Sequence, residues 1–345
     1  MTLDVPRGSS STPTESGAER VVAGAAGGGR GMVTNRYADW LRAQGVRLHR
    51  AAGIEWRVYN GALLPLHDVP RPVDLSSADA RQLLGQSGAW LIRYPGQLLL
   101  PGDGEARVAD GEAWYYVLCD SLVPLAALAK KVRYEVNVGF KHCVVRRLDP
   151  EWLAVNGYDC YRAACARYRN AGPLAAEPCF RADVMAKRNA PIEFWGVFVG
   201  ETLAGYSQCI MDDAWVYHSV AKYHPGFLKD RVSYVMVRSL MEEYTGRQGL
   251  TLVNGTRSLS HDTSYNRVLV KLGFRMVPCE LKVVYQPVLG LAVRTLFPLR
   301  HLLSRLPDSG PLHRVRTVLE LEATRRSASP DLRAPRPIPQ PLPEA

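Results

Sequence analysis

Residues 254–276 read NGTRSLSHDTSYNRVLVKLGFRM, a polar loop followed by a short amphipathic segment, a glycine and an aromatic residue. The apolar residues of the segment recur at the spacing of one face of an α-helix: Tyr265, Val268, Leu269 and Leu272. We expect this helix to begin near His261 and to end at Gly273, because glycine readily adopts a left-handed C-terminal position. The polar loop therefore leads into a helix entrance.

This helix closes a longer series of predicted elements over residues 151–286. EWLAVNGYDCYRAACARY predicts two helices separated at Asn156-Gly157, and FWGVFV with LAGYSQCI predicts a hairpin around a short Gly-containing loop. Alternating side chains in AWVYHSVAKY predict a strand. A helix with an apolar stripe beginning at Leu228, the strand LTLVN, the helix described above and a strand interrupted at Pro278 follow.

The predicted order is therefore helix, hairpin, strand, helix, strand, helix, strand. A strand–helix–strand step within one sheet predicts a parallel crossover, with the helix on one face. Ligands of such sheets bind beyond the carboxyl ends of the strands, opposite the helix entrances. Two entrances qualify here, residues 224–229 and residues 258–263.

Composition divides the rest of the chain. Residues 1–34 are rich in Ser, Thr and Gly and are expected to be a disordered tail. We predict one subdomain over 35–150, made of strands and a basic helix from Pro124 onward, and a second domain over 151–306. Residues 307–345 are expected to form a helical stub and a Pro-rich tail.

The net charge of +10 indicates an anionic partner if the partner is charged, such as a phosphate-bearing cofactor, nucleic acid or a membrane surface. The seven cysteines are scattered and form no CxxC pair, which argues against a disulfide framework and a zinc site. We read no signal peptide and no continuous apolar span in the sequence. A cytoplasmic location is therefore expected, with contact at the inner membrane face left open.

The order of elements, with GVFVGETLAGYSQCI leading and VLVKLGF closing, resembles the GNAT superfamily of acyl-CoA-dependent N-acyltransferases over about residues 190–286. The preceding block, with its basic segment LAKKVRYEVNVGFKHC, looks like the first unit of tandem-GNAT, Fem-type (FemAB-like) aminoacyl transferases and their relatives. The GTRS…H.T loop is similar to one in uncharacterised bacterial proteins of that type. The resemblance implies an α+β (α/β) fold: a GNAT-like mixed sheet flanked by helices, preceded by a second, partial GNAT-like unit.

The resemblance also implies acyl-CoA as the donor substrate, with no metal. It places the donor phosphates on the backbone at the entrance YHPGFLKDR, although this loop has a single glycine. The cofactor-binding candidates are Gly226, Phe227, Leu228, Lys229, Arg231 and Asn254. The general-acid Tyr of many GNAT enzymes is replaced by Leu269, and the Asn seven residues earlier by Asp262.

The catalytic candidates are Arg257, His261, Asp262 and His218. Capping of the helix is the alternative role for the loop residues, but capping needs no guanidinium, whereas recognition of a carboxylate or phosphate uses one. For His218, a hydrogen-bonded core histidine and a general base remain open alternatives.

We therefore expect an N-acyltransferase that moves an acyl group, or less favourably an aminoacyl group, to an amine of a small-molecule or cell-envelope acceptor. A non-catalytic GNAT-like module that binds acyl-CoA or RNA is the alternative. Transfer RNA is a less favoured partner, because the chain shows no long charged helical hairpin. Residues 287–306 combine apolar residues with arginines, so they form either a helical lid or a contact with the membrane surface.

Overall fold

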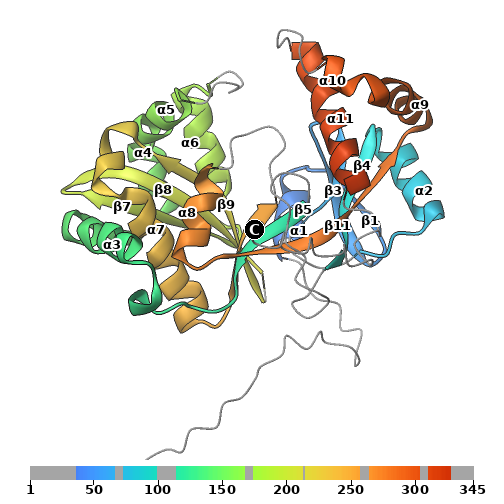
Figure 1. Cartoon of the computed structure of the whole chain (residues 1–345). Coiled ribbons are helices and arrows are strands. Elements are labelled where there is room, and N and C mark those ends of the chain that lie inside the picture. The colour runs from blue at the N-terminus through green and yellow to red at the C-terminus, as the bar shows by residue number, and fades with distance from the viewer. Residues whose placement is uncertain are drawn as a thin grey trace, which may run out of the picture. The chain divides into compact units, whose positions relative to one another are not determined.

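The computed structural model describes residues 36–66, 73–98, 114–167, 174–212, 214–256, 264–303 and 310–327. Within these residues eleven strands form one mixed sheet, in the order β1-β2-β3-β4-β11-β5-β10-β9-β8-β7-β6. Helices flank the sheet (Figure 1). The predicted fold class, α+β with a mixed sheet flanked by helices, is confirmed.

One end of the sheet is built from the N-terminal part of the chain. It contains α1 (Arg36–Ala43), β1 (Leu48–Ala51), β2 (Ile54–Tyr59), β3 (Ala62–Pro65), α2 (Ser77–Ser87) and β4 (Leu91–Leu98). Asn60 and Gly61 both have positive φ, which gives the tight turn that joins β2 to β3. The buried Trp56, Leu63 and Ile92 pack with α2 on one face of these strands.

The other end begins with β5 and runs to β10. Its elements are β5 (Trp114–Cys119), η1 (Leu125–Ala127), α3 (Lys130–His142), β6 (Cys143–Leu148), α4 (Pro150–Asn156), α5 (Tyr158–Cys165), α6 (Glu177–Ala186), β7 (Ile192–Val199), β8 (Thr202–Met211), β9 (Trp215–Tyr223), η2 (Pro225–Asp230), α7 (Val232–Leu240), the π-helix η3 (Met241–Arg247) and β10 (Thr251–Thr256). The predicted hairpin is β7–β8, and β9 and β10 are parallel as expected.

Two strands join these ends. The strand β11 (Arg275–Tyr285) follows α8 (Ser264–Leu272), pairs along its first half with β5, and pairs along its second half with β4. The predicted interruption at Pro278 is wrong, because the strand continues through this residue and pairs it with Tyr115. Since β5 lies between β10 and β11, the sheet mixes elements from the two halves of the sequence.

After β11 the chain forms α9 (Pro287–Leu296), η4 (Phe297–Leu299), α10 (Arg300–Leu303) and α11 (Gly310–Ser327). The helical segment changes from α-helix to a 3₁₀ turn around Pro298. Glu322 of α11 is buried, accepts a hydrogen bond from Tyr285 of β11 at 3.0 Å, and is paired with Arg325 and Arg326. These contacts fix α11 on the sheet.

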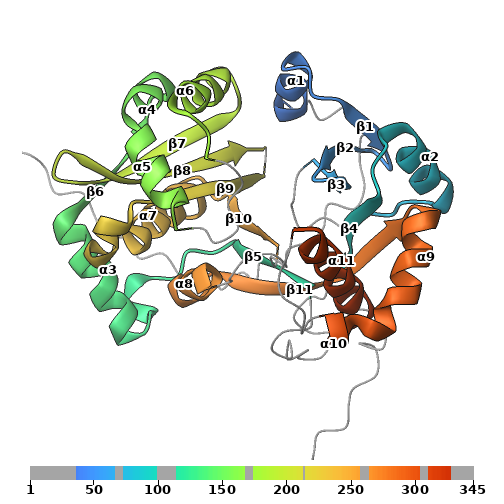
Figure 2. The same cartoon turned by 90° about the horizontal axis from the view of Figure 1, so that it is seen from above.

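Helices cover both faces of β7–β9. On one face α3, α7 and α8 pack with the strands, and on the other face lie α4, α5 and α6 (Figures 1 and 2). The helix α1 joins the second group, since Trp40 Nε1 donates to Ala186 O at 3.1 Å. The two faces of β9 are therefore enclosed by different helices.

Two predicted helix starts are corrected. The helix expected from Pro124 begins only at Lys130, after the 3₁₀ turn η1. The helix expected to include Leu228 begins at Val232, because residues 225–230 form a 3₁₀-helix and Arg231 adopts a left-handed φ of 63° between the two. The entrance to α7 therefore lies several residues later than predicted.

The predicted domain boundary, residue 150, is the first residue of α4. The sheet continues over this boundary, because β6 before it pairs with β7 after it. Residues 35–345 form one unit. The division into a first and a second GNAT-like unit stays a prediction, and the predicted tails, 1–34 and the end of 307–345, lie outside the described residues.

Candidate functional site

The parallel strands β9 and β10 separate partway along their length. Their pairing runs from Trp215–Thr251 to Tyr217–Val253 and ends there within the described residues, although β9 continues to Tyr223. Two irregularities accompany the separation. The register of β9 against β8 shifts at Ser219, and Gly255 of β10 has a φ of +91°. The fold thus opens the centre of the sheet at the carboxyl end of β9.

A buried polar cluster lies at this opening. His218 Nδ1 lies 3.0 Å from Asn254 Oδ1, and His218 Nε2 lies 3.0 Å from Ser207 Oγ. An amide oxygen only accepts hydrogen bonds, so Nδ1 carries the proton and Nε2 accepts from the serine hydroxyl. Three strands, β8, β9 and β10, each contribute one member of this serine–histidine–asparagine chain.

The environment keeps His218 uncharged. Burial lowers its pKa to about 4, and the hydrogen bond with Asn254 raises the pKa only in part. At neutral pH the imidazole is therefore neutral, with both nitrogens in hydrogen bonds. A group with this pKa is a weak base, so the geometry favours a positioning role over proton abstraction from an amine.

Two tyrosines stand at the same opening. Tyr223, at the end of β9, has its hydroxyl oxygen 3.3 Å from that of Tyr265 on α8, and the Tyr265 ring lies 6.5 Å from the His218 ring between centroids. This contact brings the first described turn of α8 to the end of β9. The end of β9 and the start of α8 therefore lie near each other, while the predicted entrance at residues 258–263 lies outside the described residues.

Tyr265 is the residue that sequence reasoning missed. We assigned it to the apolar stripe, whereas the structure places its hydroxyl at the strand opening. Leu269, which stands where the resemblance expects the general acid, is buried in the core. Tyr265 precedes it by one helical turn on the same face, and that spacing was the available signal.

The predicted phosphate loop forms the 3₁₀-helix η2, and its first amides already have partners. Gly226 N donates to His224 Nδ1 at 3.1 Å, and Phe227 N donates to His224 O at 3.1 Å. Arg231 forms an ion pair with Glu135 of α3. Lys229 is exposed and makes no ion pair within the described part of the chain. A phosphate at this turn would thus meet Lys229 first, and would need the His224 side chain to release the Gly226 amide.

Three of the four predicted catalytic residues lie outside the described residues: Arg257, His261 and Asp262. Their roles stay predictions. Of the other candidates, the structure brings His218 and Asn254 into direct contact, while Gly226, Phe227, Leu228 and Lys229 share one turn after β9.

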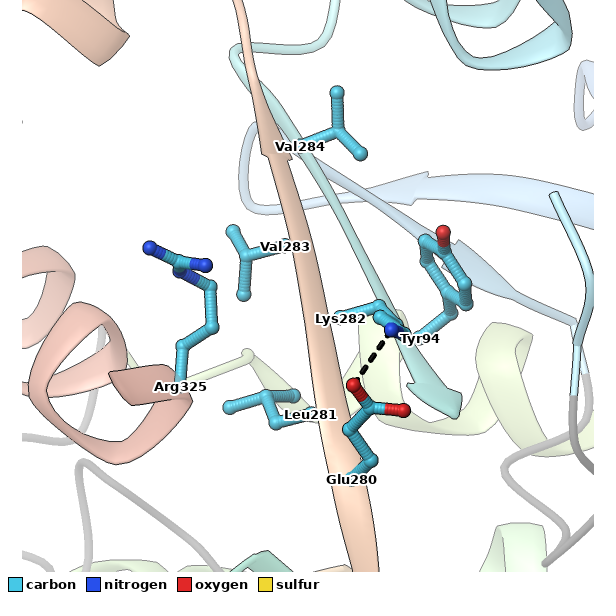
Figure 3. A pocket seen from close by; sticks show the side chains of 7 residues that line it. All are labelled: Tyr94, Glu280, Leu281, Lys282, Val283, Val284 and Arg325. Atoms are coloured by element: carbon cyan, nitrogen blue, oxygen red, sulfur yellow. Dashed lines mark ion pairs between the residues drawn. The ribbon is translucent and has the colours of Figure 1, made fainter. Parts of the chain in front are cut away.

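A separate hollow of about 130 Å³ lies beside β11 (Figure 3). Leu281 and Val283 project from one side of the strand toward Arg325, and Glu280 and Lys282 form an ion pair on the other side, where Tyr94 lies. Since its charged groups already pair with one another or with Glu322, this hollow is a weak candidate for a site. Within the described ranges, no three His, Cys, Asp or Glu residues are grouped to hold a metal ion.

Comparison with known proteins gives similarity of fold. No family model and no curated protein matches the sequence. Among solved structures, FemX is similar with a TM-score of 0.48 and 10% identity, over 74% of this chain and 93% of FemX. L-PGS from Bacillus licheniformis is similar with a TM-score of 0.44 and 11% identity, over 84% of this chain and 96% of L-PGS.

A tandem GNAT protein from the clavulanic acid biosynthesis pathway is similar with a TM-score of 0.38 and 11% identity, over 68% of this chain and 81% of that protein. Among the described helices, none has the length and apolar character needed to cross a membrane. FemX, L-PGS and this tandem GNAT protein are among the solved structures that are similar to this chain, at 10–11% identity.

Proposed function

We propose that this chain is an N-acyltransferase that moves an acyl group from a CoA thioester to an amine acceptor. The observation that carries the proposal is the opening between β9 and β10, with the neutral His218 cluster inside it and a tyrosine pair at its end. An opening in a parallel pair gives an extended donor a path to the centre of the sheet. An aminoacyl donor is the less favoured form of the same reaction.

The donor's phosphates would lie at η2, where the exposed Lys229 supplies positive charge. Leu228 and Phe227 belong to the same turn, so the nucleotide end would meet apolar surface as well. The thioester would then extend from this turn along β9, past Tyr223 toward His218. Arg231 contributes less than the sequence implied, since its guanidinium pairs with Glu135.

In the reaction the amine nitrogen bonds to the thioester carbonyl carbon, and the carbon–sulfur bond breaks. The nitrogen loses one proton to solvent or to a base, and the departing thiolate gains one proton. We assign Tyr265, whose hydroxyl lies at the opening, as the proton donor to sulfur. It would take the role of the tyrosine that the resemblance expects at position 269, where this chain has leucine. His218 remains neutral and holds Ser207 and Asn254 in place, so that the strands keep the two substrates together.

The loop before α8 adds the acceptor side of the proposal. His261 and Asp262 lie three and two residues before Ser264, where α8 begins, and Arg257 lies seven residues before it. Since Tyr265 stands at the opening, chain connectivity keeps His261 and Asp262 within a few residues of it. We therefore retain His261 and Asp262 as acid–base candidates and Arg257 as an anion-binding candidate.

The test measures binding and turnover separately. Acyl-CoAs of increasing chain length are added to the full chain, thermal unfolding reports binding, and release of free thiol with an amine mixture reports transfer. Stabilisation with thiol release supports the proposal. Stabilisation without release with any amine would instead assign the chain to the class of binding modules, which the buried Leu269 favours. No stabilisation by any acyl-CoA would refute the donor.

We also propose that α9 and α10 contact an anionic membrane surface. The exposed apolar side chains of these helices and of η4 between them are Val288, Leu291, Leu299 and Leu302, with exposed fractions of 77%, 66%, 49% and 61%. Arg294 is exposed on the same helices. An apolar face with a cation fits the headgroup region. Vesicles containing phosphatidylglycerol should sediment the protein, and V288S/L291S should lose at least half of the bound fraction, whereas V144S on β6 should not.

A further inference from the structure

A second cavity, larger than the hollow beside β11, lies on the face of β9 opposite His218. It has a volume of about 620 Å³ and extends over one side of the sheet from β2 to β8. Tyr217 and Ser219 of β9 line it, as do Arg57 of β2 and Arg93 of β4. Tyr37 of α1 and Lys187 at the end of α6 also line it, from the helical side. Its volume falls within the range of small-molecule sites, about 300–1,000 Å³.

The charge of this cavity is unbalanced. Its lining contains Arg57, Arg93 and Lys187 against a single carboxylate, Asp183. Asp183 is already paired with Lys187 at 2.6 Å. Within the described residues, neither arginine forms an ion pair with a carboxylate, so two half-buried guanidinium groups retain their charge in the cavity.

Both arginines lie against aromatic rings. The guanidinium carbon of Arg93 lies 5.0 Å from the ring centre of Trp114, and that of Arg57 lies 5.8 Å from the ring centre of Tyr59. Stacking of this kind holds the plane of the guanidinium. Arg57 already forms a side-chain hydrogen bond with Tyr37, so a ligand would use the N–H groups that this contact leaves. The Nε of Arg57 is buried without a hydrogen-bond partner among the described residues. Such a group costs folding free energy, and an oxygen of a ligand in the cavity would reduce that cost by accepting its hydrogen bond.

We propose that this cavity binds the amine acceptor through an anionic group of that acceptor, a carboxylate or a phosphate, held by Arg57 and Arg93. The proposal rests on the acyl transfer proposed above and names its acceptor class, an amine that also carries an anion. Oxygen pairs in both groups match the two-pronged geometry of a guanidinium.

The position of the cavity relates the anion to the reaction. Tyr217 and Ser219 face the cavity, while His218 between them faces the donor side. Because β9 and β10 separate just beyond Tyr217, an acceptor held in the cavity lies beside the opening. The donor and the acceptor would therefore approach the same point from opposite faces of the sheet, which keeps their phosphate and anionic groups apart.

The experiment tests anion binding without requiring catalysis. Inorganic phosphate and acetate are titrated into the full chain at constant ionic strength, with heat of binding and thermal unfolding as readouts. The variants are Arg93→Gln and Arg57→Gln, with Arg93→Lys as a charge-preserving check. Arg162→Gln is the matched control, because Arg162 is exposed on α5 and pairs with Asp159 outside the cavity. Lys229→Gln tests the donor turn.

We expect at least one anion to bind saturably, and we expect each cavity variant to weaken that binding tenfold or more. Arg93→Lys should retain part of the binding, which also shows that the variant protein folds. The anion that binds more tightly identifies the acceptor group as phosphate or carboxylate. Binding that is absent, or equal in wild type and both glutamine variants, or lost only in Lys229→Gln, overturns the inference. Arginine-dependent binding in a protein that no acyl-CoA stabilises would keep the anion site and refute the acyl transfer.

Discussion

The two faces of β9 differ in whether their polar groups are paired with one another. On one face His218 is buried with both ring nitrogens in hydrogen bonds, and burial keeps it neutral. On the other face Arg57 and Arg93 keep their charges in a cavity without carboxylate partners among the described residues. A cluster whose groups satisfy one another fixes geometry, whereas a cavity with excess charge is suited to a ligand. We infer that the first face positions the reaction and the second selects the acceptor.

The tyrosine pair gives the strongest test of the positioning face. Replacing Tyr265 by Phe removes the hydroxyl that we assign as the proton donor to the leaving sulfur, and it keeps the ring packed against Tyr223. We expect kcat for thiol release to fall by about two to four orders of magnitude, the usual contribution of a general acid. Acyl-CoA affinity should change little.

The control for this variant is Tyr134→Phe, since Tyr134 is 63% exposed on α3. It should leave kcat unchanged. If Tyr265→Phe also retained full kcat, the proton donor would have to be sought in the loop before α8.

The His218 cluster should make stability depend on pH. The pKa of His218 is about 4 in the folded chain and about 6.5 when exposed to water, so the unfolded chain binds the proton first. Its stabilising contribution is therefore complete above pH 6.5 and is lost as the pH falls through 4. The two pKa values set this loss at about 3 kcal/mol of unfolding free energy.

Urea unfolding at several pH values between 7.5 and 4 measures this loss. His218→Gln keeps hydrogen-bonding capacity but has no titrating group, so its stability should fall less over the same range. Carboxylates titrate in both proteins, and the difference between the two curves isolates the histidine. Identical curves would show that His218 is not the buried neutral group described above.

The sequence predicted local structure well where periodicity determined it. The order of elements from β7 to β11, the buried Leu269 and the positive φ of Gly273 all follow from patterns within a few residues. The predicted interruption at Pro278 was wrong, because β11 pairs with β5 on both sides of the proline. The sequence alone does not show this pairing. The start of α7 was misplaced because the 3₁₀ turn and the left-handed Arg231 leave no periodic signal.

The site itself depended on contacts that no local pattern contains. Ser207, His218 and Asn254 meet only because the register of three strands and the shift at Ser219 bring them together. Arg57 and Arg93 reach the same cavity as Tyr217 only because β5 and β11 join the two ends of the sheet. Predicting such sites requires strand order, which one sequence does not specify.

One serine on each face, Ser207 and Ser219, allows the two faces to be compared through the stability cost of losing a hydroxyl. Ser207 is fully buried and donates to His218, whereas Ser219 faces the cavity, accepts from Gln208 Nε2 at 3.0 Å and donates to Gln208 O at 3.2 Å. Ser207→Ala leaves a buried imidazole nitrogen without a donor, which should cost about 1–3 kcal/mol of unfolding free energy. Ser219→Ala should cost at most about 0.5 kcal/mol, because water in the cavity replaces the hydroxyl. Chemical unfolding of the two alanine variants measures both values, and equal losses would mean that the two faces do not differ in the way their hydrogen bonds suggest.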